Sequence, residues 1–163
     1  MIIPSLIPVV ASQMVASNLQ IRTSANDAMN ALVDKSESNV MMQTLSNIAI
    51  YGGNVKIKSF VLESLSGKLS LKDTMAERNG NLTHHYGMIV VVERGYSPKS
   101  IAIAKYVIPC CVKLFSDNRT EIRTQNKKLL KKLYSLMGDE LIDAMIHTGL
   151  PNENRTSLIA SLK

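Results

Sequence analysis

Apolar residues recur along most of this chain at intervals of three and four, which is the spacing of one face of an α-helix. The pattern predicts helices over residues 5–15, 19–33, 39–50, 54–69, 98–115, 119–137, 140–147 and 151–162. Residues 83–94 include a run of mainly β-branched side chains that a buried strand could also contain. No second convincing strand is present to pair with it, so we expect a buried helix there. The polar stretch 70–82 is expected to be an internal loop.

Turn residues mark several of the predicted helix ends. Asn18 and Asn54 are typical N-caps, because an Asn side chain accepts hydrogen bonds from the free amides of the first turn. Gly52-Gly53 is expected to end the third helix with a left-handed cap. Pro109 lies inside a helical pattern and should kink that helix or begin a new turn.

A short motif recurs where one helix ends and the next begins. The three copies read Asn18-Leu19-Gln20-Ile21-Arg22, Asn54-Val55-Lys56-Ile57-Lys58 and Arg119-Thr120-Glu121-Ile122-Arg123. The first two lie 36 residues apart, within the usual length of a two-helix repeat, and the third lies 65 residues further on. The second interval is longer than the first by roughly one helix, which matches an insertion or extra helix over residues 70–94.

This repetition predicts an all-α fold, a HEAT/ARM-like α-solenoid of stacked helical hairpins. One hairpin cannot bury its apolar face alone, whereas stacked hairpins share a continuous core with their turns on one edge. We expect the isoleucine of each motif to point into the core. The cation after it should be architectural, bonded to acidic or carbonyl groups of a neighbouring turn, with Asp117 as a natural partner for Arg123.

The composition agrees with a single domain over residues 1–163, or part of a larger array. The chain is 45% hydrophobic but only 4% aromatic, with nine Met and no Trp, so aliphatic side chains and Met must fill the core. The net charge of +6 and the pI of about 9.4 favour an acidic partner: nucleic acid, an anionic membrane or an acidic protein. No apolar run is long enough for a membrane span, and there is no signal peptide, so we expect a reducing compartment.

The motifs of catalysis and metal binding are missing from the sequence. There is no P-loop or dinucleotide fingerprint, and the adjacent His84 and His85 would point in different directions. Cys110 and Cys111 are adjacent, a spacing that rarely allows a disulfide, and we interpret them as buried apolar thiols. We therefore expect no enzyme activity, no cofactor, no metal and no small-molecule substrate.

The predicted helix over residues 119–132 is strongly basic, which raises nucleic acid as an alternative partner. Arg123, Lys127 and Lys131 fall on one stripe that could follow phosphates. The simpler interpretation is the solvated face of an amphipathic helix. No aromatic residue interleaves with these cations, which argues against base stacking on single strands.

In these segments the sequence resembles the TOG family of HEAT-repeat domains, in its CLASP and crescerin branch. The likeness lies in residues 6–32, in residues 54–65 and above all in residues 108–136, where an apolar helix with an internal Pro precedes Ser-Asp, Glu-Ile-Arg and a basic helix that ends in Gly. Residues 150–162 are similar to the closing helix of such domains. The chain has no Trp and an uncharged first turn, two departures from the family, and it resembles the C-terminal portion of a TOG domain.

The resemblance implies a flat paddle that binds αβ-tubulin through the turns within its repeats. Carried over by position, the tubulin-binding residues are Ser17, Asn18, Gln20, Gly53, Asn54, Lys56, Asn118, Arg119 and Thr120. Lys56 and Arg119 are the cations expected to face tubulin's acidic surface. The implied location is cytoplasmic, on microtubules, including those of a cilium or centrosome. The alternatives are a HEAT-type scaffold for another protein and a basic helical repeat that associates with nucleic acid.

Overall fold

The computed structural model describes residues 3–66 and 101–162, and every regular element in these two ranges is helical. The first range contains α1 (Ile3–Gln13), α2 (Leu19–Lys35), α3 (Ser38–Tyr51) and α4 (Val55–Ser66). The second contains a π-helical segment (Ile103–Val107), α6 (Ile108–Phe115), α7 (Thr120–Met137), α8 (Glu140–His147), a 3₁₀ turn (Asn152–Asn154) and α9 (Arg155–Leu162). The all-α class is confirmed for this part of the chain. The predictions for residues 70–82, 83–94 and 95–98 lie outside the described residues.

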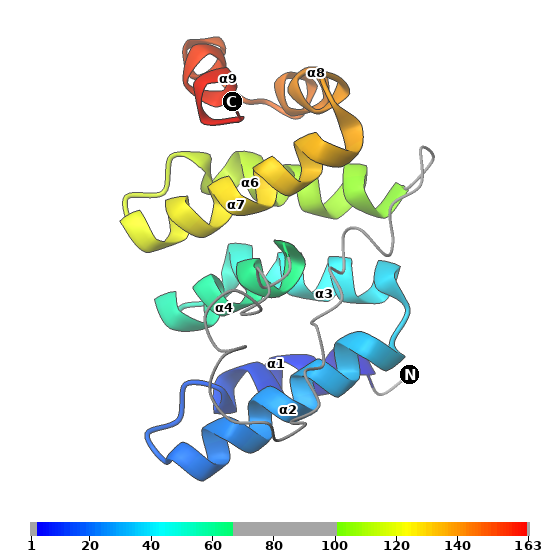
Figure 1. Ribbon diagram of the computed structural model, residues 1–163, viewed down its shortest axis with the longest axis vertical. Helices are drawn as coiled ribbons and strands as arrows, with labels where there is room; N and C mark the ends of the chain where they lie inside the picture. Colours follow the sequence, from blue (N-terminus) through cyan, green and yellow to red (C-terminus); the bar gives the residue numbers. More distant parts are fainter. Residues whose placement is uncertain (1–2, 67–100, 163) are drawn as a thin grey trace, which may run out of the picture.

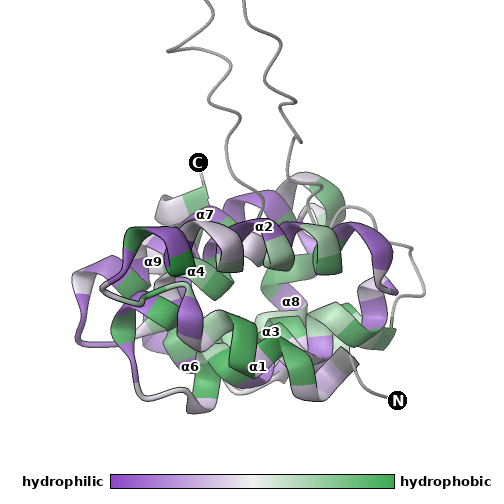
Figure 2. Cartoon of the chain, turned by 90° about the horizontal axis from the view of Figure 1, so that it is seen from below, coloured by the Kyte–Doolittle hydropathy of each residue, from purple (hydrophilic) through white to green (hydrophobic). Residues whose placement is uncertain are grey.

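The helices form pairs that are piled along the longest axis of the molecule (Figure 1). Within each pair the two helices contact each other: α1 with α2, α3 with α4, α6 with α7, and α8 with α9. Successive pairs also touch, through α1 with α3, α3 with α6, and α4 with α7. Seen along the pile, α1, α3 and α6 lie on one side and α2, α4 and α7 on the other (Figure 2).

The core lies between these two layers and is built from aliphatic side chains and Met. In α7 the buried positions are Ile122, Asn126, Leu129, Leu130 and Leu133, a stripe at helical spacing that faces the other helices. Burial of each large aliphatic side chain contributes about 1.5–3 kcal/mol. The polar member of this stripe, Asn126, is satisfied only in part: its amide nitrogen donates to the backbone carbonyl of Cys111 over 2.9 Å, whereas its buried Oδ1 accepts no hydrogen bond from the described residues.

Both cysteines are buried in this core, as the sequence predicted. Cys110 and Cys111 are free thiols with no exposed surface. Burial disfavours the thiolate and raises the pKa of Cys110 to about 12, and it raises the pKa of Cys111 as well. The two thiols therefore behave as small apolar side chains.

Pro109 begins a new helical turn, one of the two outcomes expected for it. Pro109 occupies the first turn of α6, and the preceding residues Ile103–Val107 form a π-helical segment. The amide of Ile108 donates to the carbonyl of Ile103, five residues back. This wider turn relieves the clash that a proline ring makes with the carbonyl four residues before it.

The left-handed cap predicted at Gly52-Gly53 is wrong. Gly52 is extended, with φ −62° and ψ 138°, and its amide donates to the Ile48 carbonyl over 2.8 Å. A Cβ at this position would lie 2.5 Å from the Ile48 oxygen, so glycine is needed for close approach rather than for positive φ. Positive φ is found instead at Gly138, with φ 62°, after α7, and at Gly149, with φ 106°, after α8.

Candidate interaction site

The three turns that carry the repeated motif lie along one edge of the pile. Figure 1 shows the α1/α2, α3/α4 and α6/α7 turns together at the left, while the connection between α2 and α3 lies at the right. We call the predicted residues in these turns the turn edge: Ser17, Asn18, Gln20, Gly53, Asn54, Lys56, Asn118, Arg119 and Thr120. All are exposed except Arg119, which is half-buried.

Two of the turns are closed by the predicted N-caps. The Asn18 side-chain oxygen accepts from the amides of Gln20 and Ile21, at 2.9 and 3.2 Å. The Asn54 oxygen accepts from the amides of Lys56 and Ile57, at 2.9 and 3.4 Å. The side-chain oxygen of each Asn therefore caps its own helix, and the amide nitrogen of the side chain is presented at the edge.

The cation of each motif bonds a backbone carbonyl, but in its own turn rather than in a neighbouring turn as predicted. Arg22 donates to Ala16 over 2.9 Å, Lys58 to Ile50 over 3.0 Å, and Arg123 to Asp117 over 2.7 Å. Arg123 reaches the backbone oxygen of Asp117 rather than its carboxylate. These three cations hold the chain as it leaves one helix and enters the next, so their role is architectural.

The isoleucines of the motif do not share one environment. Ile122 is fully buried and Ile57 is half-buried, but Ile21 is 46% exposed. The expectation that each isoleucine points into the core is therefore wrong for Ile21. The reason is position in the pile, because α1 and α2 form its first described pair and no described helix covers their outer side (Figure 1).

Arg119 is held by Asp117 instead of projecting freely from the turn. Its Nε and Nη2 donate to the two carboxylate oxygens of Asp117, each over 2.8 Å, and its amide donates to the same carboxylate over 2.9 Å. These bonds to Arg119 lower the pKa of Asp117 to about 2, and the positive charge of Lys58 contributes. Much of Arg119's charge is thus neutralised locally, and it is a weaker contact candidate than the sequence suggested.

Lys56 is the exposed cation of the turn edge. Its side chain has no ion pair among the described residues, and it follows directly from the capped turn at Asn54. Its charge is therefore available to a partner at the centre of the edge.

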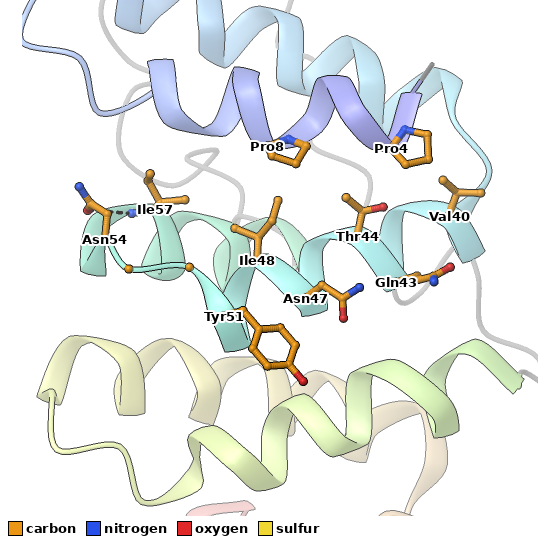
Figure 3. Close-up of a pocket in the computed structure, with 12 residues that line it drawn as sticks. Pro4, Pro8, Val40, Gln43, Thr44, Asn47, Ile48, Tyr51, Asn54 and Ile57 are labelled. Carbon is orange, nitrogen blue, oxygen red and sulfur yellow. Dashed lines mark hydrogen bonds between the residues drawn. The ribbon is translucent and has the colours of Figure 1, made fainter. Parts of the chain in front are cut away.

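Tyr51 and Lys113 are edge residues that the sequence reasoning missed. Tyr51 is 75% exposed, and the Lys113 ammonium lies 4.9 Å from the centre of its ring. Figure 3 shows the ring of Tyr51, from the end of α3, pointing toward the neighbouring helix pair. Its place immediately before Gly52-Gly53, in one of the three repeated turns, was the available signal.

An open groove runs from this edge between α1 and α3. Its volume is about 620 Å³, and Pro4 and Pro8 of α1 face Thr44 and Ile48 of α3 across it (Figure 3). The other lining residues are Val40, Gln43, Asn47, Tyr51, Gly52, Gly53, Asn54 and Ile57. The lining is uncharged and mostly apolar, so the groove offers apolar contact beside the cationic turn.

The exposed cations of α7, which we call the α7 stripe, lie on the layer formed by α2, α4 and α7. Lys127, Lys128 and Lys131 are exposed, as is Arg123. Their helix belongs to the α2, α4 and α7 layer, opposite the layer that carries Tyr51 and Lys113 (Figure 2). Residues 3–66 and 101–162 thus form two cationic surfaces, the turn edge and the α7 stripe.

Residues 3–66 and 101–162 contain neither a membrane-spanning helix nor a metal-binding cluster. None of the helices there has both the length and the apolar character that a bilayer crossing requires. No cluster of three or more His, Cys, Asp or Glu side chains in these ranges could hold a metal ion.

Compared with models of known protein families and with curated proteins, the sequence matches neither. The functional conclusion therefore depends on the geometry of the turn edge and on the resemblance carried by the sequence motifs.

Proposed function

We propose that this chain is part of a HEAT-type α-solenoid, a non-catalytic module that binds an acidic protein surface through its turn edge, with tubulin as the partner. The observation that supports this most is the alignment of three similarly built turns along one edge (Figure 1). Such alignment is how repeat proteins make an extended binding surface, because each repeat adds one turn to the same rim.

The charge of the edge supports an acidic partner. Cations outnumber carboxylates around these turns: Arg22, Lys56, Lys58, Lys113, Arg119 and Arg123 against Asp117 and Glu121. Lys56 and Lys113 are exposed, and neither has an ion pair among the described residues. Exposed charges of this kind steer encounter with a partner of opposite sign and select against basic partners.

The exposed Tyr51 favours a protein partner over a partner that is bound by charge alone. Tyrosine is enriched among the few residues that dominate binding energy at protein interfaces, because it combines apolar area with a polar end. The Lys113 contact holds the ring beside the edge and adds a cation there. Tyr51 thus offers an aromatic contact on an edge that has no Trp.

The choice of tubulin comes from the resemblance to TOG domains, and the α7 stripe supports the alternative partner, nucleic acid. Lys127, Lys128 and Lys131 could neutralise phosphates along a helix face. The two proposals use different surfaces, so matched charge reversals distinguish them.

The test is binding of αβ-tubulin and co-sedimentation with microtubules at increasing salt. Lys56→Glu should weaken binding about five- to thirtyfold, because it removes one attraction and adds one repulsion. Lys131→Glu is the matched control, since it makes the same charge change at an exposed position on α7. Arg119→Glu is a poor reporter, because it also breaks the Asp117 ion pair that shapes the turn.

A second variant separates recognition from folding. Asn54→Asp keeps a side-chain oxygen at the N-cap, and Asp caps a helix as well as Asn does. The substitution places a negative charge beside Lys56. It should weaken tubulin binding and leave the melting temperature unchanged or higher. If Lys56→Glu and Lys131→Glu weaken tubulin binding equally, the turn edge is not the binding site. Binding to duplex DNA that is lost only with Lys131→Glu would replace the proposal with nucleic-acid association.

A further inference from the structure

The groove between α1 and α3, which we call the α1/α3 groove, has two amide side chains along one rim that the proposed function does not use. Gln43, Asn47 and Tyr51 of α3 line the groove and are exposed (Figure 3). They recur every four residues, so they lie in a row along one side of the helix. The amides of Gln43 and Asn47 make no hydrogen bond with any described residue. Both are therefore available to a ligand.

The spacing of these two amides matches the backbone of an extended peptide. Residues four apart on a helix are separated by about 6 Å along its axis, and two residues of an extended chain span about 6.6 Å. An amide side chain both donates and accepts hydrogen bonds, as a peptide group does. Gln43 and Asn47 can therefore pair with peptide groups two residues apart in one extended segment. A helical ligand offers no such partners along its length, because its backbone groups bond one another.

The walls beside this rim are mostly apolar and rigid. Val40, Thr44 and Ile48 are half-buried on α3, and Pro4 and Pro8 of α1 lie opposite them (Figure 3). β-Branched side chains are stiff at χ1, and a proline ring has almost no rotamer freedom to lose. A ligand that covers these walls therefore loses little binding energy to side-chain ordering. The lining of α3 from Val40 to Tyr51 is about 16 Å long, which is the length of about five extended residues.

Charges of opposite sign flank the two ends of α3. Lys113 is exposed, and its ammonium lies 4.9 Å from the centre of the Tyr51 ring at the C-terminal end. Glu37 is exposed and directly precedes the first residue of α3. Neither has an ion pair among the described residues, and the groove lining between them is uncharged. A complementary ligand therefore has an acidic group at the Tyr51 end and a basic group at the Glu37 end.

We propose that the α1/α3 groove binds an extended peptide segment of another protein, with an acidic residue at the Tyr51 end and a basic residue at the Glu37 end. Gln43 and Asn47 pair with the peptide backbone, and alternate side chains of the peptide contact the apolar walls. The groove reaches the turn edge at its Tyr51 end, whereas both amides lie outside the turn edge. This inference does not depend on tubulin as the partner.

A synthetic array of nine-residue peptides of random sequence tests the predicted specificity. The bound peptides should be enriched in an acidic residue near one end, a basic residue near the other, and apolar side chains at alternate positions between them. Lys113→Glu should replace the acidic preference by a basic one and leave the other preferences unchanged. An array without bound peptides, a bound set without this pattern, or the same pattern in Lys113→Glu would overturn the proposal.

Fluorescence anisotropy with the tightest array peptide, labelled with fluorescein, tests the role of the amides. Asn47→Ala should raise the Kd about tenfold, because it removes the side chain that pairs with the backbone of the peptide. Gln13→Ala is the matched control, since Gln13 is an exposed amide of α1 that does not line the groove, and it should leave the Kd unchanged. Equal effects of the two variants would show that the peptide binds elsewhere. Lys56→Glu tests the turn edge and Asn47→Ala tests the groove, so either proposal can fail without the other.

Methylation of single backbone nitrogens in the same peptide distinguishes an extended ligand from a helical one. Each methyl group removes one backbone donor. Binding should be weakened most at two positions that are two residues apart, and the position between them should tolerate the change, because its amide points away from α3. Sensitivity at consecutive positions would indicate a helical ligand and would overturn the proposal.

Discussion

The ammonium of Lys58 donates to the backbone carbonyl of Ile50 over 3.0 Å, although Lys58 is only 6% exposed. This bond fastens the start of α4 to the end of α3. Hydrogen bonds from Arg119 chiefly lower the pKa of Asp117, and the charge of Lys58 on the neighbouring turn adds a smaller effect in the same direction. One side chain thus links two neighbouring turns of the edge.

Removal of the Lys58 charge should loosen both turns. Lys58→Met keeps most of the apolar stem but leaves the Ile50 carbonyl without this donor, and we expect a loss of about 1–3 kcal/mol in the free energy of unfolding. Lys58→Arg, which retains a donor, should lose less. Chemical denaturation measures both variants. An NMR titration of Asp117 should show its pKa rising in Lys58→Met, and an unchanged pKa would contradict the coupling.

The low pKa of Asp117 makes stability depend on pH in the acidic range. The folded pKa is about 2, below the value of about 3.9 for an unfolded Asp, so the native state favours the charged form. The resulting stabilisation is fully present above pH 4 and is lost as the pH falls toward 2. Asp117→Asn should therefore be less stable than wild type at pH 7, with the difference shrinking between pH 4 and 2. A constant difference measured by denaturation over that range would refute the assignment.

Three glycines should respond differently to the same change to Ala. Gly138→Ala should lower the free energy of unfolding by about 1–3 kcal/mol, because φ 62° and ψ −141° are accessible almost only to glycine. Gly52→Ala should also destabilise, because its Cβ would meet the Ile48 oxygen at 2.5 Å. Gly53→Ala is the control, since a Cβ there meets nothing within 4 Å, and it should be neutral or slightly stabilising. Thermal unfolding of the three variants measures this order.

The cysteines should be unreactive while the chain is folded. Cys110 and Cys111 are fully buried, and the raised pKa of each thiol further reduces the reactive thiolate. Labelling with a chromogenic disulfide at pH 8 should be slow in buffer and complete within minutes in denaturant. Rapid labelling of one thiol under native conditions would show that the packing between α6 and α7 opens readily.

Local features of the turns could be predicted from the sequence because their causes are local. The caps at Asn18 and Asn54 depend on side-chain chemistry two or three residues away, and the restart of the helix at Pro109 depends on its missing amide. The architectural role predicted for the motif cations agrees with their hydrogen bonds, since a long cationic side chain at the fourth residue of a helix can reach the carbonyls of the turn before it. The all-α class followed from apolar spacing over whole helices.

The surroundings of each turn were decided by tertiary structure. Ile21 and Ile57 have the same local sequence context, yet their exposure differs because a helix pair covers one and no described helix covers the other. Arg119 and Lys56 both appeared as edge cations, but only Arg119 folds back onto a carboxylate. The approach of Tyr51 and Lys113 joins α3 to α6, helices far apart in the chain. Burial and pairing between distant segments depend on how the pairs stack, which no short window of sequence contains.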